Sequence, residues 1–265
     1  MFKILSIAGS DCSGGAGVQA DIKTVAAHGM YGMSVITALT AQNTTGVFGV
    51  QEADEDFVGM QMDAVFSDIF PDAVKIGMVS SAGLIRVIAE KLRRYNVGNI
   101  VVDPVMVSTS GSKLLSDGAV EALTGELFPL ARLVTPNLRE SEALCGMEVA
   151  TEGDMINATE MICKTYYNCA VLVKGGHSAK DATDILYDDG RVIRLHGKRI
   201  DNRNTHGTGC TLSTAIACRL AEGRGLEESV RLAKGYLTKA LEAMLDLGAG
   251  SGPLDHNVMR AAYNA

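Results

Sequence analysis

The sequence has few of the features that mark a secreted protein or a protein held together by a bound metal. Tryptophan is absent, proline occurs only 5 times, and none of the 6 cysteines forms a Cys-x-x-Cys pair. No histidine spacing completes a zinc site with them, so we expect free thiols in a reducing compartment. The chain begins Met1-Phe2-Lys3-Ile4 and enters a strand-like segment at once. We therefore predict no signal peptide and a cytoplasmic location.

Basic residues are also scarce. Lys and Arg number 24 against 31 Asp and Glu, a net charge of −7, so a nucleic-acid partner is not expected. The uncharged stretch between Lys23 and Glu52 is interrupted by Gly29 and Gly32, which excludes a membrane span there. With 265 residues, 47% of them hydrophobic, the chain can bury about 70% of its unfolded surface. No linker divides it, and we expect residues 1–265 to form one domain.

Short apolar runs rich in valine and isoleucine alternate with segments of helical period. The runs predict buried strands at residues 3–8, 33–40, 73–77, 99–103, 133–135 and 170–174. The periodic segments predict helices at residues 18–28, 56–69, 84–95, 117–130, 140–145, 154–166, 211–222 and 226–247. Alternating strands and helices predict an α/β fold, a three-layer αβα sandwich around a mostly parallel sheet.

One segment breaks this alternation. Residues 183–187 and 191–195 flank the triplet Asp188-Asp189-Gly190 and predict a β-hairpin with an Asp-Gly turn. The hairpin would add antiparallel strands at one edge of the sheet.

The first glycine-rich loop, residues 9–17, joins a predicted strand to a predicted helix. A Gly-x-Gly-x-x-Ala run matches part of the dinucleotide fingerprint, which also needs an acidic residue about 20 residues on. None occurs between Asp21 and Glu52, and no Gly-Lys-Ser/Thr triplet of a P-loop exists. An NAD-dependent oxidoreductase is therefore disfavoured. The loop is either a tight turn or brings Asp11, Ser13 and backbone N–H groups to a ligand at a strand end.

The second loop, residues 204–211, opens an amphipathic helix with the sequence Asn-Thr-His-Gly-Thr-Gly-Cys-Thr. The first N–H groups of a helix lack intrahelical partners and lie at the positive end of the dipole, so we predict an anion site where this loop enters the helix. Cys210 is predicted to have a lowered pKa and partial thiolate character; its alternative is a small buried residue. For His206, a hydrogen-bonding role and a catalytic role both stay open.

Charged side chains follow three further strands. Asp103 and Glu140 lie after neighbouring strands, where two carboxylates near an anion site can hold Mg²⁺ through water. The alternatives are a turn aspartate and a charge at a helix N-terminus. Lys174 ends another strand and would neutralise phosphate there, unless it is an ordinary surface lysine.

Taken together and in chain order, the segments 8–21, 38–44, 75–78, 103–107, 135–140, 173–177 and 206–213 form a pattern covering nearly the whole chain. This pattern resembles the hydroxymethylpyrimidine/phosphomethylpyrimidine kinases, the thiamin-biosynthesis branch of the ribokinase superfamily. The resemblance implies a ribokinase-like fold. It also implies ATP-dependent phosphorylation of 4-amino-5-hydroxymethyl-2-methylpyrimidine, and then of its monophosphate to the diphosphate.

The resemblance also implies roles for single residues, with ATP and Mg²⁺ as cofactors. In the substrate pocket, Gln42 would bind the aminopyrimidine edge, between walls formed by Gly9, Ala16, Met78 and Val105. The anion hole would consist of Gly207, Thr208, Gly209 and Cys210, with Cys210 accepting the proton where most ribokinase relatives carry an aspartate. Lys174 resembles an ATP-phosphate contact, and Asn137 and Glu140 match the family's Asn-x-x-Glu magnesium and phosphate motif. A homodimer is implied as well.

Three alternatives stay open at this point. The first is pyridoxal kinase of the same branch, whose members tend to carry Met at the position of Gln42 and a Cys-Lys-Gly lid where this chain has Ser108-Thr109-Ser110-Gly111. The second is a non-catalytic pyrimidine sensor, which would lose the phosphate-binding residues. The third is the NAD-dependent enzyme above. Residues 108–113 are further predicted to form a mobile lid.

Overall fold

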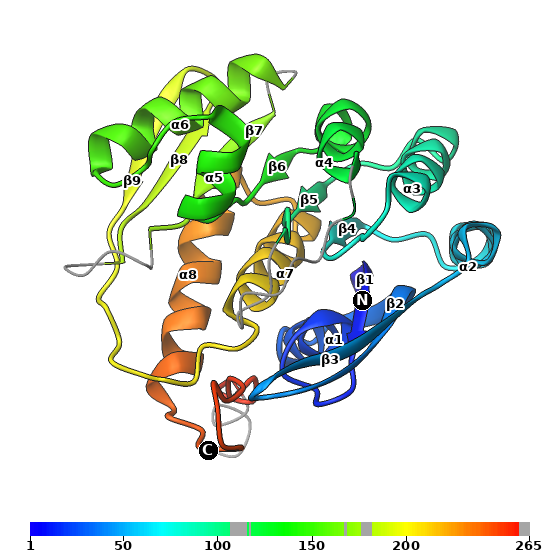
Figure 1. The fold of residues 1–265 in the computed structure, drawn as a ribbon, viewed down its shortest axis with the longest axis horizontal. Coiled ribbons are helices and arrows are strands. Elements are labelled where there is room, and N and C mark those ends of the chain that lie inside the picture. Colours follow the sequence, from blue (N-terminus) through cyan, green and yellow to red (C-terminus); the bar gives the residue numbers. More distant parts are fainter. Residues whose placement is uncertain (107–115, 117, 167–168, 176–181, 260–265) are drawn as a thin grey trace.

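Strands with apolar side chains on both faces need helices on both sides, and the computed structural model has this arrangement (Figure 1). It describes residues 1–106, 116, 118–166, 169–175 and 182–259. Along β1 (Lys3–Asp11), Leu5 and Ile7 belong to one apolar core and Ile4 to another. The same alternation recurs on the other central strands, so the sheet is buried on both faces.

Within the described residues one sheet has the order β3-β2-β1-β4-β5-β6-β7-β8-β9. The other strands are β2 (Tyr31–Asn43), β3 (Gly46–Glu52), β4 (Ala73–Ile76), β5 (Ile100–Val102), β6 (Leu133–Val134), β7 (Ala170–Val173), β8 (Asp184–Asp188) and β9 (Arg191–Leu195). The strands from β2 to β7 in this order are parallel, whereas β3 and β8 run antiparallel to their neighbours. The carboxyl ends of the parallel strands therefore meet at one edge.

Two helical layers complete the predicted sandwich. One face is covered by α2 (Glu55–Asp68), α3 (Ala82–Arg94), α4 (Ala119–Ala122), α5 (Leu138–Cys145) and α6 (Glu152–Thr165). The other face is covered by α1 (Gly17–Ala27), α7 (Thr208–Ala221) and α8 (Leu226–Glu242). In the described part of the chain, no helix is long and apolar enough to cross a membrane. The predicted α/β three-layer architecture is confirmed.

The two sheet edges differ in how well the sequence predicted them. The β8–β9 hairpin is confirmed: Asp189 and Gly190 both have positive φ, 49° and 78°, as a type I′ turn requires. The opposite edge strand β3 was not predicted. Its glycines at 46 and 49 and its exposed side chains hide any alternation, and it is held by backbone pairing to β2.

Two predicted helices differ from the structure. In the region predicted as residues 117–130, α4 is followed by a π-helical turn and a 3₁₀ turn. The helix predicted to reach residue 247 ends at Glu242, because Met244 has φ +50° and Asn202 and Asn204 donate to the carbonyls of Leu241 and Leu245. The predicted lid, residues 108–113, lies outside the described residues.

Candidate active site

The predicted site residues come from the ends of neighbouring strands. Gln42 lies near the end of β2, Gly9 near the end of β1, Met78 after β4, Asp103 and Val105 after β5, Asn137 and Glu140 after β6, and Lys174 after β7. Because these strands are parallel, all of these residues gather at the carboxyl edge of the sheet. The first turn of α7, which packs against β1, β4 and β5, supplies Thr208, Gly209 and Cys210.

Asp11 closes the first glycine loop upon itself. Its Oδ1 accepts from the backbone N–H and hydroxyl of Ser13, both at 2.8 Å, and its Oδ2 accepts from the N–H groups of Gly15 (3.0 Å) and Ala16 (2.8 Å). His206 Nε2 lies 2.9 Å from the same Oδ2. Burial raises the pKa of Asp11, but these hydrogen bonds outweigh it and hold the pKa below its usual range. The N–H groups of this loop are thus occupied by a carboxylate.

The two glycine loops touch each other. Gly207, the N-cap of α7, has φ +83°, and a Cβ at this position would overlap the carbonyl oxygen of Gly15. Only glycine fits both the backbone conformation and the close approach. The contact fixes the N-terminal turn of α7 beside the start of α1, and the first N–H groups of α7 lie at the positive end of its dipole.

An ion pair lies beside this turn. Lys174 Nζ is 2.7 Å from Asp103 Oδ1, which also accepts from the hydroxyl of Thr135 at 3.0 Å. A Cβ on Gly209 would lie 3.1 Å from Asp103 Oδ2 and 3.5 Å from Lys174 Nζ, so the pair faces the helix start directly. Burial disfavours the charge on Lys174, but Asp103 and Glu140 outweigh burial and raise its pKa. A protonated lysine and a helix N-terminus therefore converge at one point.

Asn137 and Glu140 form a capping box at the start of α5. Asn137 Oδ1 accepts from the N–H of Glu140 at 3.0 Å, and Glu140 Oε2 accepts from the N–H of Asn137 at 2.8 Å. Burial, with the nearby charge of Asp103, raises the pKa of Glu140 to about 7, although Lys174 opposes the shift. The alternative role of Glu140 at a helix N-terminus is confirmed, and it leaves a carboxyl of raised pKa near the ion pair.

The predicted thiolate character of Cys210 is wrong. Burial raises the pKa of this thiol; Lys75 lowers it, while Asp21 and Asp103 raise it further. The sequence shows the helix start but neither this burial nor the two carboxylates. In this structure Cys210 is a neutral thiol at neutral pH.

Among the predicted pocket residues, Gly9 and Met78 pack against each other. A Cβ on Gly9 would overlap the terminal methyl of Met78, so these two residues pack together. On the other side, the Gln42 amide lies 3.3 Å from His206 Nε2. Val105 follows Asp103 at the end of the neighbouring β5.

The sequence did not predict a second, fully buried ion pair. Lys75 Nζ lies 2.8 and 3.0 Å from the two oxygens of Asp21, which also accept from Ser6 Oγ (2.6 Å) and Thr214 Oγ1 (2.8 Å). This network ties α1, β1, β4 and α7 together. The signal was present: a lysine inside the apolar run Ala-Val-Lys-Ile needs a buried partner.

The segment after α8 was missed too. It returns to the second glycine loop, where Gly252 O accepts from His206 N at 3.2 Å and Gly252 N donates to Asn204 Oδ1 at 3.1 Å. Further along, His256 Nε2 lies 3.0 Å from Thr211 Oγ1 in the first turns of α7, and burial lowers the pKa of His256 to about 4. This segment therefore holds the second glycine loop and the first turns of α7.

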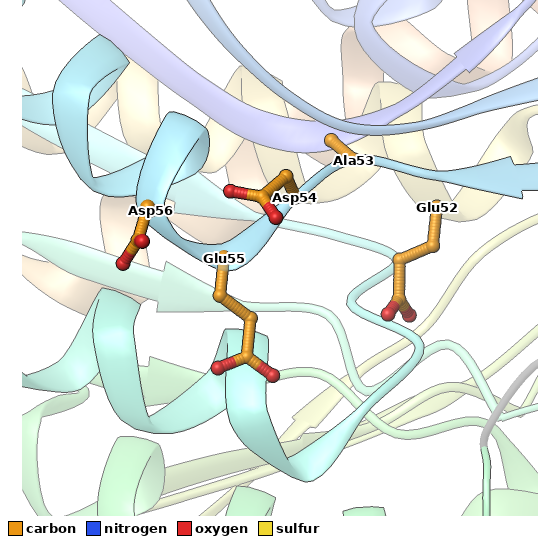
Figure 2. A pocket seen from close by; sticks show the side chains of 5 residues that line it. All are labelled: Glu52, Ala53, Asp54, Glu55 and Asp56. Carbon is orange, nitrogen blue, oxygen red and sulfur yellow. The ribbon is translucent and has the colours of Figure 1, made fainter.

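The structure also has a shallow hollow of about 550 Å³ on another part of the surface. Figure 2 shows the side chains that line it: Glu52, Ala53, Asp54, Glu55 and Asp56. Four carboxylates repel a phosphorylated ligand, and none of the predicted site residues is among them. We place the candidate active site at the strand ends instead.

Comparisons with known proteins agree with one another. The family model of phosphomethylpyrimidine kinase matches residues 11–255. The chain is 54% identical over 256 residues to a hydroxymethylpyrimidine/phosphomethylpyrimidine kinase of Rhizobium meliloti, covering 95% of this chain and 96% of the relative. The crystal structure of phosphomethylpyrimidine kinase from Clostridium difficile has a TM-score of 0.80 at 46% identity, covering 91% and 99%. An ADP complex of Bacillus subtilis pyridoxal kinase has a TM-score of 0.91 at 36% identity, covering 98% and 99%.

Proposed function

The chain belongs to the phosphomethylpyrimidine kinase family and has its ribokinase-like fold, and we propose that it phosphorylates 4-amino-5-hydroxymethyl-2-methylpyrimidine with ATP and then its monophosphate, in thiamin biosynthesis. The match of the family model over residues 11–255 carries this conclusion. We further propose that residues 1–265 are one kinase domain acting in the cytoplasm.

The phosphate side of the reaction belongs to Lys174 and the first turn of α7. Phosphoryl transfer depends mainly on positioning and on neutralising charge spread over the phosphoryl oxygens. A protonated Lys174 beside Gly209 would offer a cation next to the helix N-terminus. Thr208 would take part through the same turn, where its N–H donates to the carbonyl of Thr205 at 3.3 Å. The N–H of Gly207 belongs to the same turn, and Asn137 lies one strand away.

The carboxylates nearby fit a magnesium ion that is held partly by other ligands. Asp103 and Glu140 can both supply oxygen ligands, and Asp103 is close enough to raise the pKa of Glu140, while Lys174 opposes that shift. No cluster of three metal-ligating side chains occurs among residues 1–106, 116, 118–166, 169–175 and 182–259. Mg²⁺ commonly keeps several waters and binds through one or two carboxylates plus substrate phosphates, which agrees with this donor set. When bound, it would neutralise phosphate charge.

The substrate that accepts the phosphoryl group would bind at the other half of the carboxyl edge of the sheet, which we call the acceptor side. Gln42 would bind the aminopyrimidine edge, while Gly9, Met78, Ala16 and Val105 wall the ring. Cys210 belongs to the same turn of α7 as Gly209, and we propose that it takes the hydroxymethyl proton. Because its thiol is neutral in this structure, it must lose its own proton before it accepts another.

The proposal is tested by ADP release from the purified protein with Mg-ATP. Hydroxymethylpyrimidine, its monophosphate and pyridoxal are supplied in parallel, and kcat/KM is compared. We expect both pyrimidines to exceed pyridoxal. A higher kcat/KM for pyridoxal would assign the chain to the pyridoxal kinase activity named for the Bacillus subtilis neighbour and would contradict the role given to Gln42.

We also propose that the chain forms a homodimer through the β2–β3 edge. Leu39, Phe48 and Val50 are 53%, 70% and 48% exposed there, and β3 is the last strand of the sheet on this side. An exposed edge strand with apolar side chains is a ready surface for a second copy. Light scattering should give twice the mass of the chain for the wild type and the mass of one chain for Phe48→Glu. A monomeric wild type would overturn this proposal.

A further inference from the structure

Three side chains from three separate segments meet beside the acceptor side of the site. Asp11 ends β1, Gln42 lies near the end of β2, and His206 precedes α7. His206 Nε2 is 2.9 Å from Asp11 Oδ2 and 3.3 Å from the terminal amide of Gln42. The side chains of His206 and Asp11 are only 13% and 3% exposed.

The hydrogen bonds around Asp11 decide which atom of His206 carries a proton. Asp11 is a carboxylate of lowered pKa that accepts from Ser13, Gly15 and Ala16. A carboxylate can only accept, so the ring nitrogen that faces it must be protonated. Both the neutral Nε2–H tautomer and the doubly protonated ring satisfy this condition. In either form Nε2 is a donor.

A donor at Nε2 in turn decides how the Gln42 amide is turned. An NH₂ group facing the Nε2–H would bring two donors together, whereas the amide oxygen accepts this proton as a three-centre bond shared with Asp11. The two ends of an amide occupy almost the same volume, so a turn of 180° about the last torsion satisfies the bond without other movement. The NH₂ group then points away from His206.

We propose that His206, held by Asp11, is a positioning residue that sets the direction of the Gln42 amide and thereby the preference for an aminopyrimidine. The inference rests on the proposed function. With its oxygen bound to His206, the amide offers a remaining lone pair to an exocyclic amino group and an N–H to the ring nitrogen beside it. Pyridoxal has no such amino group next to its ring nitrogen.

Packing leaves these groups little freedom. A Cβ on Gly15 would overlap the imidazole ring of His206, and the same position lies 3.3 Å from Pro253. The backbone of His206 is held by Gly252. The thiol of Cys12, which directly follows β1, donates to the carbonyl of Gln42 in β2 at 3.1 Å. With both backbones fixed, the amide torsion of Gln42 is the variable that His206 controls.

The test compares His206→Leu with His206→Gln, whose amide N–H can replace the Nε2–H. For His206→Leu we expect kcat/KM for hydroxymethylpyrimidine to fall about 10-fold or more, through KM, with a change of less than about 3-fold for pyridoxal. His206→Gln should restore the wild-type ratio within about 3-fold. In a Gln42→Leu background the His206→Leu change should have no further effect on this ratio, because the group that it positions is gone. Equal losses for both substrates would overturn the proposal.

A second measurement does not depend on turnover. Long-range ¹H–¹⁵N NMR of the wild-type protein should show His206 Nε2 protonated, and an unprotonated Nε2 would overturn the proposal. A wild type that phosphorylates pyridoxal but not the pyrimidine would instead contradict the proposed function. The NMR spectrum would still decide the proton position, so the two failures are distinguishable.

Discussion

Two lysine–aspartate pairs lie beside α7, and they differ in what surrounds them. Lys75 and Asp21 have fully buried side chains, and Asp21 is completed by the hydroxyls of Ser6 and Thr214. Lys174 is 15% exposed, and its partner Asp103 shares its surroundings with the carboxyl of Glu140. One pair is sealed and balanced. The other, the open pair, is partly exposed, and the carboxyls of Asp103 and Glu140 both act on its lysine.

The difference separates a structural role from a chemical one. The sealed pair joins two strands and two helices and holds α7 in place, but no ligand can reach it. The open pair faces the helix start through Gly209, where an anion can approach Lys174. The same two residue types therefore serve the fold in one place and the reaction in the other, according to access and charge balance.

The largest effect should come from breaking the sealed pair. Lys75→Met leaves Asp21 as an uncompensated buried charge, which costs about 3–5 kcal/mol of unfolding free energy. Urea denaturation measures this loss. Adding Asp21→Asn removes the stranded charge and should recover part of it. A loss below about 1 kcal/mol for Lys75→Met would show that the pair does not hold the fold.

Breaking the open pair should act on the rate instead. Lys174→Met removes a preorganised cation from the transferred phosphoryl group, so kcat/KM should fall about 10²- to 10³-fold, or about 3–4 kcal/mol. Its unfolding free energy should fall by less than that of Lys75→Met, because Lys174 is reached by water. Steady-state ADP release and urea denaturation on the same preparation separate the two effects. A variant that is destabilised but fully active would reverse the assignment.

Cys210 sharpens the comparison because the charges of both pairs act on its thiol. Cys210→Ala should lower kcat by about 10²-fold or more, the usual loss for a general base. Because the pKa of the thiol is raised, kcat of the wild type should rise with pH as the thiolate forms, and this rise should vanish in the variant. An unchanged kcat would leave Cys210 a packing role.

The carboxyl of Glu140 beside the open pair predicts a smaller, pH-dependent effect. Glu140 has a pKa of about 7 in the fold against an ordinary 4.5. Between these values the folded state binds more protons than the unfolded state, so the contribution of Glu140 to stability falls as pH rises from 4.5 to 7. Glu140→Gln, which keeps an oxygen for the capping box, should therefore gain about 2 kcal/mol relative to the wild type between pH 5 and pH 8. If the difference in unfolding free energy between Glu140→Gln and the wild type is the same at pH 5 and pH 8, this shift is contradicted.

The sequence predicted the parts of the fold that depend on local pattern. The six parallel strands are mostly apolar runs, and the β8–β9 turn has an Asp-Gly pair at the positions of positive φ. Strand β3 has no such pattern, since its glycines and exposed side chains form a strand only because β2 offers a free edge. The end of α8 depends on Asn202 and Asn204, which are distant in sequence.

For the site, the sequence identified the residues better than their environments. Parallel strand ends bring Asp103, Asn137 and Lys174 together as expected. The direction of the Cys210 pKa could not be predicted, because burial outweighs the helix start. The contact of His206 with Asp11 spans 195 positions and depends on two loops touching, which no spacing within either loop indicates.

The most direct test of the central claim, that the open pair receives the phosphates, is the thermal shift caused by Mg-ATP. A ligand that binds the folded state raises Tm. We expect a rise for the wild type and for Lys91→Met, whose lysine pairs with Asp63 away from the strand ends. For Lys174→Met we expect this rise to be largely lost. A Lys174→Met variant stabilised by Mg-ATP as strongly as the wild type would contradict the account.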